Sequence, residues 1–137
     1  MNTFFTKLLN YYDLTVADYE RLCAKVTSDD LPRAHDFFNF DKFIKRIEKA
    51  IDSDEKVVIY GDYDADGILA TCILKYAFNK RGKDVFTMIP SRYKDGYSLN
   101  TAVVDKFSNR GINLIITVDN GVNQYAAIDL ANALGID

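Results

Sequence analysis

Three short apolar runs, each followed by a helical pattern, constrain the fold of this chain more than any other feature. The runs are KVVIY (56–60), DVFTMI (84–89) and NLIITV (113–118). They contain β-branched residues, as strands do, and KVVIY has the composition of a buried strand. The helical patterns behind them span residues 68–78, 101–110 and 126–134. Strands that alternate with helices over short connections predict an α/β fold, with a parallel, Rossmann-like sheet flanked by helices and joined by right-handed crossovers.

A further helix is predicted before the first strand. Its apolar positions recur at helical spacing and are Phe40, Phe43, Ile44, Ile47 and Ile51, while Lys45, Arg46 and Lys49 lie elsewhere on its surface. Residues 1–38 are less regular, with a short helix expected within residues 14–26. We therefore divide the chain into an N-terminal extension, residues 1–38, and a main domain, residues 39–137.

The helix over residues 68–78 is apolar nearly all round, which predicts that it is well buried. Cys72 lies in it, so we expect a buried free thiol. Free thiols fit a reducing compartment. The first twenty residues lack a sustained apolar stretch and a small-residue cleavage site, and no segment has the length and hydrophobicity to cross a membrane. We therefore expect a cytoplasmic protein.

Charge and composition place limits on function. The 137 residues carry a net charge of -3, so the chain as a whole does not attract nucleic acid. Contact with nucleic acid must come from a local patch or from sequence outside this chain. His35, the single histidine, lies far from the acidic motifs in sequence, and we expect it to be a surface or capping residue without a catalytic role.

Acidic residues follow the first and third predicted strands. Asp62, Asp64 and Asp66 lie in the loop GDYDADG (61–67), and Asp119 ends the third strand. The carboxyl ends of parallel strands meet at one sheet edge, where ligands of such sheets bind. Carboxylates this close repel one another unless a cation lies between them, and their hard oxygen atoms suit Mg²⁺ or Mn²⁺. The pattern predicts a metal site.

The same aspartates have a simpler interpretation as turn formers and helix caps. Asp62 or Asp66 is the candidate for such a role. This interpretation explains the full set less well, because it must account for three acids in one loop and a fourth at the end of a neighbouring strand.

A second loop, PSRYKDGYSL (90–99), alternates basic and aromatic residues. Arg92 and Lys94 suit phosphate oxygens, and Tyr97 suits the face of a base. On this local pattern alone, a solvated loop with a turn at Gly96 explains the segment better. Residues 75–94 also carry six basic residues against Asp84, which is the usual composition of a solvated face.

These motifs together resemble DHH phosphoesterases, in the form found in the single-stranded-DNA exonucleases of that family. VVIYGDYDADGILAT resembles the first motif, PSRYKDGYSL the P-x-R-x-x-x-G-Y segment, and LIITVDNG the third acidic motif, in which a cysteine usually stands at the position of Asn120. FDKFIKRIEKAI resembles the helix that leads into these motifs. The resemblance covers about residues 36–137.

The resemblance implies metal-assisted hydrolysis of phosphodiester bonds, with nucleotides removed from the 5′ end of single-stranded DNA in repair and recombination. Asp64, Asp66 and Asp119 would be catalytic ligands of a Mn²⁺ or Mg²⁺ pair, and Asp62 would support the loop or reach metal through water. The substrate would contact the basic and aromatic loop, namely Arg92, Lys94 and Tyr97. A single-stranded-DNA-binding protein and a helicase are further candidate partners.

The family's Asp-His-His motif is expected after the next strand, and this chain ends about where that strand is expected to begin. We therefore expect a fragment that is inactive alone. Two other functions stay open: a phosphatase of oligonucleotides, cyclic dinucleotides or pyrophosphate, and a receiver-like signalling domain, which also binds Mg²⁺ through acids at strand ends. Receiver domains lack a DxDxDG loop. The sequence GDYDADG resembles the exonuclease form of the DHH motif, which argues against the phosphatase.

Overall fold

The computed structural model describes every residue of the chain except 1, 2, 92, 94, 95 and 97. Its backbone contacts divide it into two compact units, Met1–Phe40 and Asp41–Asp137. None of the helices in the described part is long and apolar enough to cross a membrane.

The first unit consists of short helices with little buried surface. They are α1 (Thr3–Tyr11), α2 (Val16–Cys23) and two 3₁₀ turns, Ser28–Asp30 and Ala34–Asp36. Thr15 and Asp18 form a capping box at the start of α2, in which the Thr15 hydroxyl accepts from the Asp18 amide and the Asp18 carboxylate accepts from the Thr15 amide. The helix α2 was expected from the sequence, whereas α1 was not.

The second unit is built on a three-stranded parallel sheet. Its strands are β1 (Val57–Tyr60), β2 (Phe86–Met88) and β3 (Leu114–Thr117), in the order β2-β1-β3. Both neighbours run parallel to β1, so that Val58 pairs with Phe86 on one side and with Ile115 on the other. The parallel sheet predicted from the three apolar runs is confirmed.

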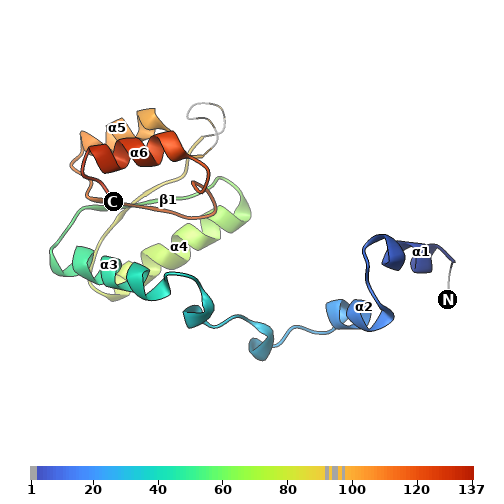
Figure 1. Ribbon diagram of the computed structural model, residues 1–137. Coiled ribbons are helices and arrows are strands. Elements are labelled where there is room, and N and C mark those ends of the chain that lie inside the picture. Colours follow the sequence, from blue (N-terminus) through green and yellow to red (C-terminus); the bar gives the residue numbers. More distant parts are fainter. Residues whose placement is uncertain (1–2, 92, 94–95, 97) are drawn as a thin grey trace. The chain divides into compact units, whose positions relative to one another are not determined.

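Helices cover both faces of this sheet (Figure 1). The helices α3 (Phe40–Asp52) and α4 (Ala65–Lys80) contribute to one hydrophobic core, with Val57 and Ile59 of β1. The helices α5 (Thr101–Ser108) and α6 (Tyr125–Ala133) contribute to the other, with Val58 and Tyr60. The alternation along β1 follows from the two-residue period of a strand.

The helix α4 is buried along one face only. Its buried residues are Gly67, Thr71 and Phe78, whereas four large apolar side chains are exposed, namely Ile68, Leu69, Ile73 and Tyr76. Cys72 lies on the exposed side. The predictions of a well-buried helix and of a buried Cys72 thiol are therefore wrong. A helix that packs on a sheet buries only the face that contacts the sheet. Apolar side chains on its opposite face stay exposed unless another element covers them.

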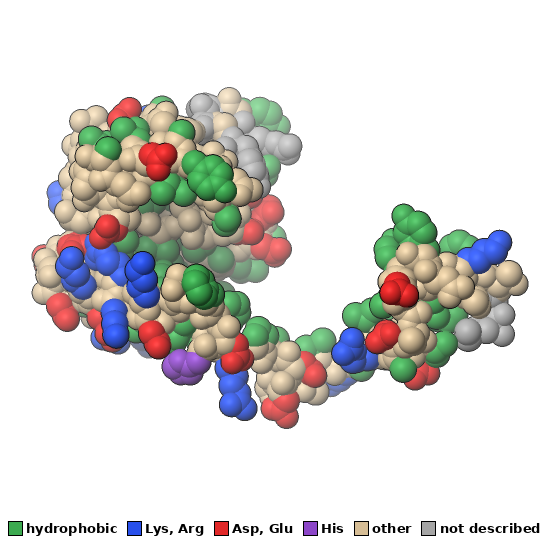
Figure 2. Space-filling view, viewed as in Figure 1, with side chains coloured by type: hydrophobic (Ala, Val, Ile, Leu, Met, Phe, Trp, Pro, Cys, Tyr) green, Lys and Arg blue, Asp and Glu red, His purple; other side chains and the backbone are tan. Residues whose placement is uncertain are grey.

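The surface of α3 exposes lysines together with acidic residues. Figure 2 shows Lys and Arg side chains around this helix, with acidic side chains among them. Its exposed lysines are Lys42, Lys45 and Lys49. Arg46 on the same helix is half-buried and pairs with two carboxylates, at 2.8 Å from Glu55 and 2.7 Å from Asp137. The surface positions predicted for this helix are thus confirmed for the two lysines, Lys45 and Lys49.

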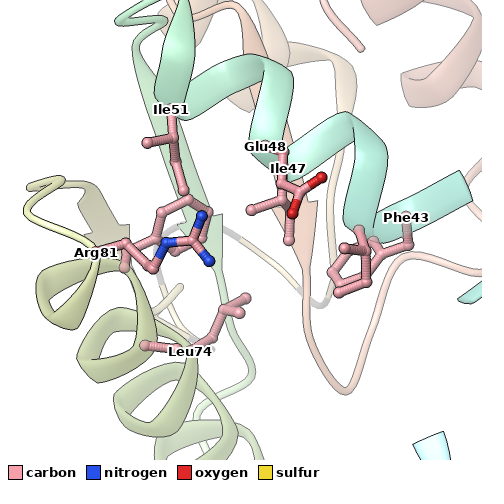
Figure 3. A pocket seen from close by; sticks show the side chains of 9 residues that line it. Phe43, Ile47, Glu48, Ile51, Leu74 and Arg81 are labelled. Carbon is pink, nitrogen blue, oxygen red and sulfur yellow. The ribbon is translucent and has the colours of Figure 1, made fainter. Parts of the chain in front are cut away.

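An apolar pocket of about 210 Å³ lies between α3 and α4. In Figure 3, Phe43, Ile47 and Ile51 of α3 face Leu74 of α4, with Glu48 and Arg81 beside them. None of the four acidic residues singled out in the sequence lines this pocket.

Asp137 pairs with the outer edge of β3. Its amide donates to the Asn113 carbonyl at 3.1 Å, and its carbonyl accepts from the Ile115 amide at 2.8 Å. In a parallel ladder, the amide and the carbonyl of one residue bond to two residues of the adjacent strand that are two positions apart. Asp137 has this pattern with Asn113 and Ile115. The edge of β3 thus accepts a parallel partner, beside the strand that leads to Asp119.

Candidate metal centre

Three carboxylates meet at the carboxyl edge of the sheet. One oxygen each from Asp62, Asp64 and Asp119 can be chosen so that all three lie within 4.8 Å of one another. Asp62 and Asp64 follow β1, and Asp119 follows the adjacent β3. Asp62 is buried, whereas Asp64 and Asp119 are exposed. Adjacent parallel strands therefore bring together acids that are more than fifty residues apart in sequence.

Asp64 also begins the helix α4. Its backbone is extended, and its Oδ1 accepts a hydrogen bond from the Gly67 amide at 3.0 Å, which is the geometry of an N-cap. The capping role that the sequence suggested for Asp62 or Asp66 thus falls on Asp64. A carboxylate has two oxygens, so capping through Oδ1 leaves Oδ2 available to a cation.

Glycines let the loop of residues 61–67 pack tightly against α4. A Cβ added to Gly67 would lie 2.7 Å from the backbone nitrogen and oxygen of Asp62. A Cβ added to Gly61 would lie 2.1 Å from the Thr71 hydroxyl, which itself donates to the Gly67 carbonyl at 2.8 Å. The two glycines of GDYDADG therefore set the position of Asp62 relative to the first turn of α4.

The turn of residues 119–121, called here the Asp119 turn, has an unusual backbone. Asp119 has φ 61° and Gly121 has φ 91°, both in the left-handed region. Aspartate and asparagine are among the few side chains that adopt this region readily. The Gly121 amide donates to the Ser98 hydroxyl at 3.1 Å. The turn therefore points the Asp119 carboxylate back toward β1 without a glycine at that position.

The acids act on one another electrostatically. Partial desolvation raises the pKa of Asp119 above its ordinary value of 3.8, and repulsion from Asp64, Asp66 and Asp62 raises it further. A group of anions that disfavour one another's charge is stabilised when a cation lies between them.

The donor set fits a hard divalent cation. Metal–oxygen bonds of about 2.0–2.6 Å place two ligands of one ion at most about 5 Å apart. The three oxygens lie within 4.8 Å of one another, so they can share one ion. Their chemistry, carboxylate oxygen without sulfur or imidazole, suits Mn²⁺ or Mg²⁺.

The remaining residues singled out in the sequence lie elsewhere. Asp66 is exposed in the first turn of α4 and is not one of the three converging carboxylates, although its charge acts on Asp119. Arg92, Lys94 and Tyr97 lie outside the described residues. Tyr93, between them, is 97% exposed.

Residues 56–137, which contain all four acids, match the family model described as "DHH family, N-terminal domain". The chain belongs to the DHH family. The resemblance read from GDYDADG, PSRYKDGYSL and LIITVDNG is therefore confirmed, and the three converging acids lie in the first and third of these DHH motifs.

Curated DHH relatives of this chain are single-stranded-DNA-specific exonucleases named RecJ. The RecJ of Bacillus subtilis is 41% identical over 92 residues, which are 67% of this chain and 12% of that protein. The RecJ of Escherichia coli is 35% identical over 97 residues, 70% of this chain and 17% of that protein. The chain thus spans less than a fifth of the length of either relative.

A solved DHH structure has a similar fold. The crystal structure of RecJ in complex with Mn²⁺ from Thermus thermophilus matches with a TM-score of 0.59 and 26% identity, over 70% of this chain and 13% of that one. The α/β fold with a parallel sheet and flanking helices is thus that of the N-terminal part of a DHH protein.

Sequence reasoning missed two residues beside the DHH acids. Ser98 is 3% exposed and holds the Asp119 turn through its hydroxyl. The Asn120 amide donates to the carbonyls of Tyr60 and Val118. The sequence offered one signal for Asn120, namely that a cysteine usually stands at this position in the motif. The role of the asparagine could not be inferred from it, because its hydrogen bonds form only where β1 and β3 lie side by side.

Proposed function

We propose that this chain supplies the first metal-binding carboxylates of a RecJ-like exonuclease that removes nucleotides from the 5′ end of single-stranded DNA. The observation that carries the proposal is the convergence of Asp62, Asp64 and Asp119 at one sheet edge. It is supported by membership of the DHH family and by relatives that are single-stranded-DNA-specific exonucleases.

In this proposal Asp64 and Asp119 hold Mn²⁺ or Mg²⁺ directly, and Asp62 holds the ion or a water bound to it. Asp66, in the first turn of α4, is a further ligand of a second ion. When bound, the ions polarise the scissile phosphate and lower the pKa of the attacking water. The chain's own task is placement, because Asp64 is fixed by its cap on α4 and Asp62 by its contact with Gly67.

The edge of β3 has a role in completing the site. The parallel pairing of Asp137 supports a further strand beside β3, whose carboxyl end would lie next to Asp119. An Asp-His-His motif at that end would add ligands for the second ion. We therefore expect the 137 residues to fold but to lack robust nuclease activity alone.

The substrate is proposed to lie over this edge. Arg92, Lys94 and Tyr97 would contact its phosphates and bases, by the chemistry of their side chains. A single-stranded-DNA-binding protein and a helicase are proposed partners in repair and recombination.

Residues 1–38 are proposed to be an N-terminal extension. Both cysteines are free thiols, which supports a cytoplasmic location.

The test is a nuclease assay on single-stranded oligonucleotides labelled at the 5′ or the 3′ end. The full-length protein is expected to release nucleotides from the 5′ end with Mn²⁺ or Mg²⁺, and Asp64→Ala within it to abolish the release. The 137-residue chain is expected to show little or no cleavage.

Two outcomes would count against the proposal. Robust metal-dependent cleavage by the 137-residue chain would show that further ligands are dispensable. Absence of nuclease activity in the full-length protein, with release of phosphate from small nucleotides instead, would favour the phosphatase.

A further inference from the structure

Asn120 links the ends of the two strands that carry the acids. Its Nδ2 donates to the carbonyl of Tyr60, the last residue of β1, at 3.2 Å. The same nitrogen donates to the carbonyl of Val118, which directly precedes Asp119, at 3.0 Å. One side-chain amide therefore joins the strand before the acidic loop to the turn that carries Asp119.

The orientation of this amide follows from its surroundings. Both neighbouring carbonyls are acceptors, so the amide must direct its NH₂ group at them, because the reverse orientation would set three oxygens against one another. Its Oδ1 is buried and accepts no hydrogen bond from the described part of the chain. The residue therefore acts here through its donors.

The backbone of the Asp119 turn needs such a link. Asp119 is in the left-handed region, and the turn is otherwise held by the Gly121 amide on Ser98 and by the Val118 amide on Tyr60. These two bonds lie on either side of Asp119, one before it and one after it. In the part of the chain that the structure describes, hydrogen bonds from the Asn120 side chain join the end of β1 to the turn itself.

We propose that Asn120 is a positioning residue, which holds the Asp119 carboxylate beside Asp62 and Asp64 by tying the Asp119 turn to the end of β1. The inference rests on the proposed metal site. Asn120 itself touches neither ion nor substrate in this account. Groups that orient metal ligands in this indirect way typically change metal affinity about 10–100-fold when removed.

The test compares Asn120→Ala with Asn123→Ala, a control that removes an exposed side-chain amide of the same type three residues further along the chain. Binding of Mn²⁺ to the 137-residue chain is measured by electron paramagnetic resonance, at a temperature where circular dichroism shows each variant folded. Asn120→Ala is expected to weaken binding about 10–100-fold, and Asn123→Ala to leave it unchanged.

A second readout does not involve metal. Hydrogen exchange in the metal-free protein is expected to accelerate at the Val118 and Gly121 amides of Asn120→Ala, while the Ile59 amide in the sheet centre keeps its protection. If Asn120 had a merely structural role, its replacement by alanine would raise hydrogen exchange across the whole sheet and leave the Mn²⁺ affinity of the folded protein unchanged. If Asn120→Ala does not fold, Asn120→Ser replaces it, because a hydroxyl donates one hydrogen bond where the amide donates two.

Asp119→Ala separates failure of this inference from failure of the proposed function. Equal Mn²⁺ binding by Asp119→Ala and the unaltered chain, or no saturable binding by either, would contradict the metal site itself. Weak binding by Asp119→Ala, together with equal binding by the two asparagine variants, would contradict the role of Asn120 alone.

Discussion

Gly67 lies against Asp62 so closely that a side chain at position 67 would overlap the Asp62 backbone. An added Cβ would lie 2.7 Å from three Asp62 atoms, namely N, O and Cβ. Gly67→Ala would gain about 0.5–1 kcal/mol of helix propensity, but overpacking against backbone costs about 1–3 kcal/mol. We expect a net loss of stability in urea unfolding and weaker Mn²⁺ binding, because Asp62 must move.

Gly82→Ala is the control for this substitution. Gly82 has φ 74° with no atom within 4 Å of an added Cβ, so alanine there is strained by about 1–2 kcal/mol without a clash. It is expected to lower stability but to leave Mn²⁺ affinity unchanged. Unaltered Mn²⁺ affinity in Gly67→Ala as well would show that Asp62 is not held by this contact.

Substitution of Asp64 can separate its two roles. Asparagine caps helices about as well as aspartate, so Asp64→Asn is expected to keep the stability of the metal-free protein and to lose Mn²⁺ binding. Asp64→Ala removes the cap as well and is expected to cost about 0.5–2 kcal/mol in addition. Urea unfolding in EDTA and Mn²⁺ titration measure the two effects. Equal stability of both variants would mean that the Gly67 hydrogen bond contributes nothing.

The raised pKa of Asp119 predicts a dependence of stability on pH. Desolvation first, and then repulsion from the other acids, disfavour the ionised carboxylate in the folded state. The contribution of Asp119 to stability is therefore greatest while it is protonated, below its ordinary pKa of 3.8, and it falls as the pH rises through the raised value. Asp119→Asn, which also suits the left-handed backbone, is expected to stabilise the metal-free protein at pH 7.

The gain from Asp119→Asn should disappear as the pH falls below 3.8. Mn²⁺ should reverse the order at pH 7, because only the unaltered chain gains stability by binding it. Urea midpoints at several pH values, with EDTA or Mn²⁺, make this measurement. A destabilised Asp119→Asn in EDTA at pH 7 would contradict the repulsion.

Much of the sheet could be predicted because each strand is a local apolar run. The meeting of Asp64 with Asp119 followed from a general rule of parallel sheets. The exposure of Cys72 could not be predicted in the same way, because α4 is apolar on both faces and its periodicity does not say which face meets the sheet. The role of Asn120 also lay beyond reach, since its two partners are brought together only by the pairing of β1 with β3.

The helix α1 was missed although its sequence carries a helical signal. Phe4, Phe5, Leu8 and Leu9 recur at helical spacing, but the helix spans only nine residues and buries only Leu9 among its described residues. The sequence suggested Asp62 or Asp66 as the helix cap, whereas Asp64 is the cap in the structure. The three residues are all aspartates, two positions apart, so residue type alone does not tell which of them caps the helix. Only the start of α4 at Ala65 distinguishes them.

The central claim is that Asp62, Asp64 and Asp119 share a divalent cation, and Mn²⁺ soaked into crystals of this chain tests it most directly. Anomalous scattering locates the ion independently of any activity. We expect a Mn²⁺ peak at about 2.0–2.6 Å from an oxygen of each of the three aspartates, and its loss in crystals of Asp119→Ala. A peak bound elsewhere, or no peak at millimolar Mn²⁺, would contradict the account.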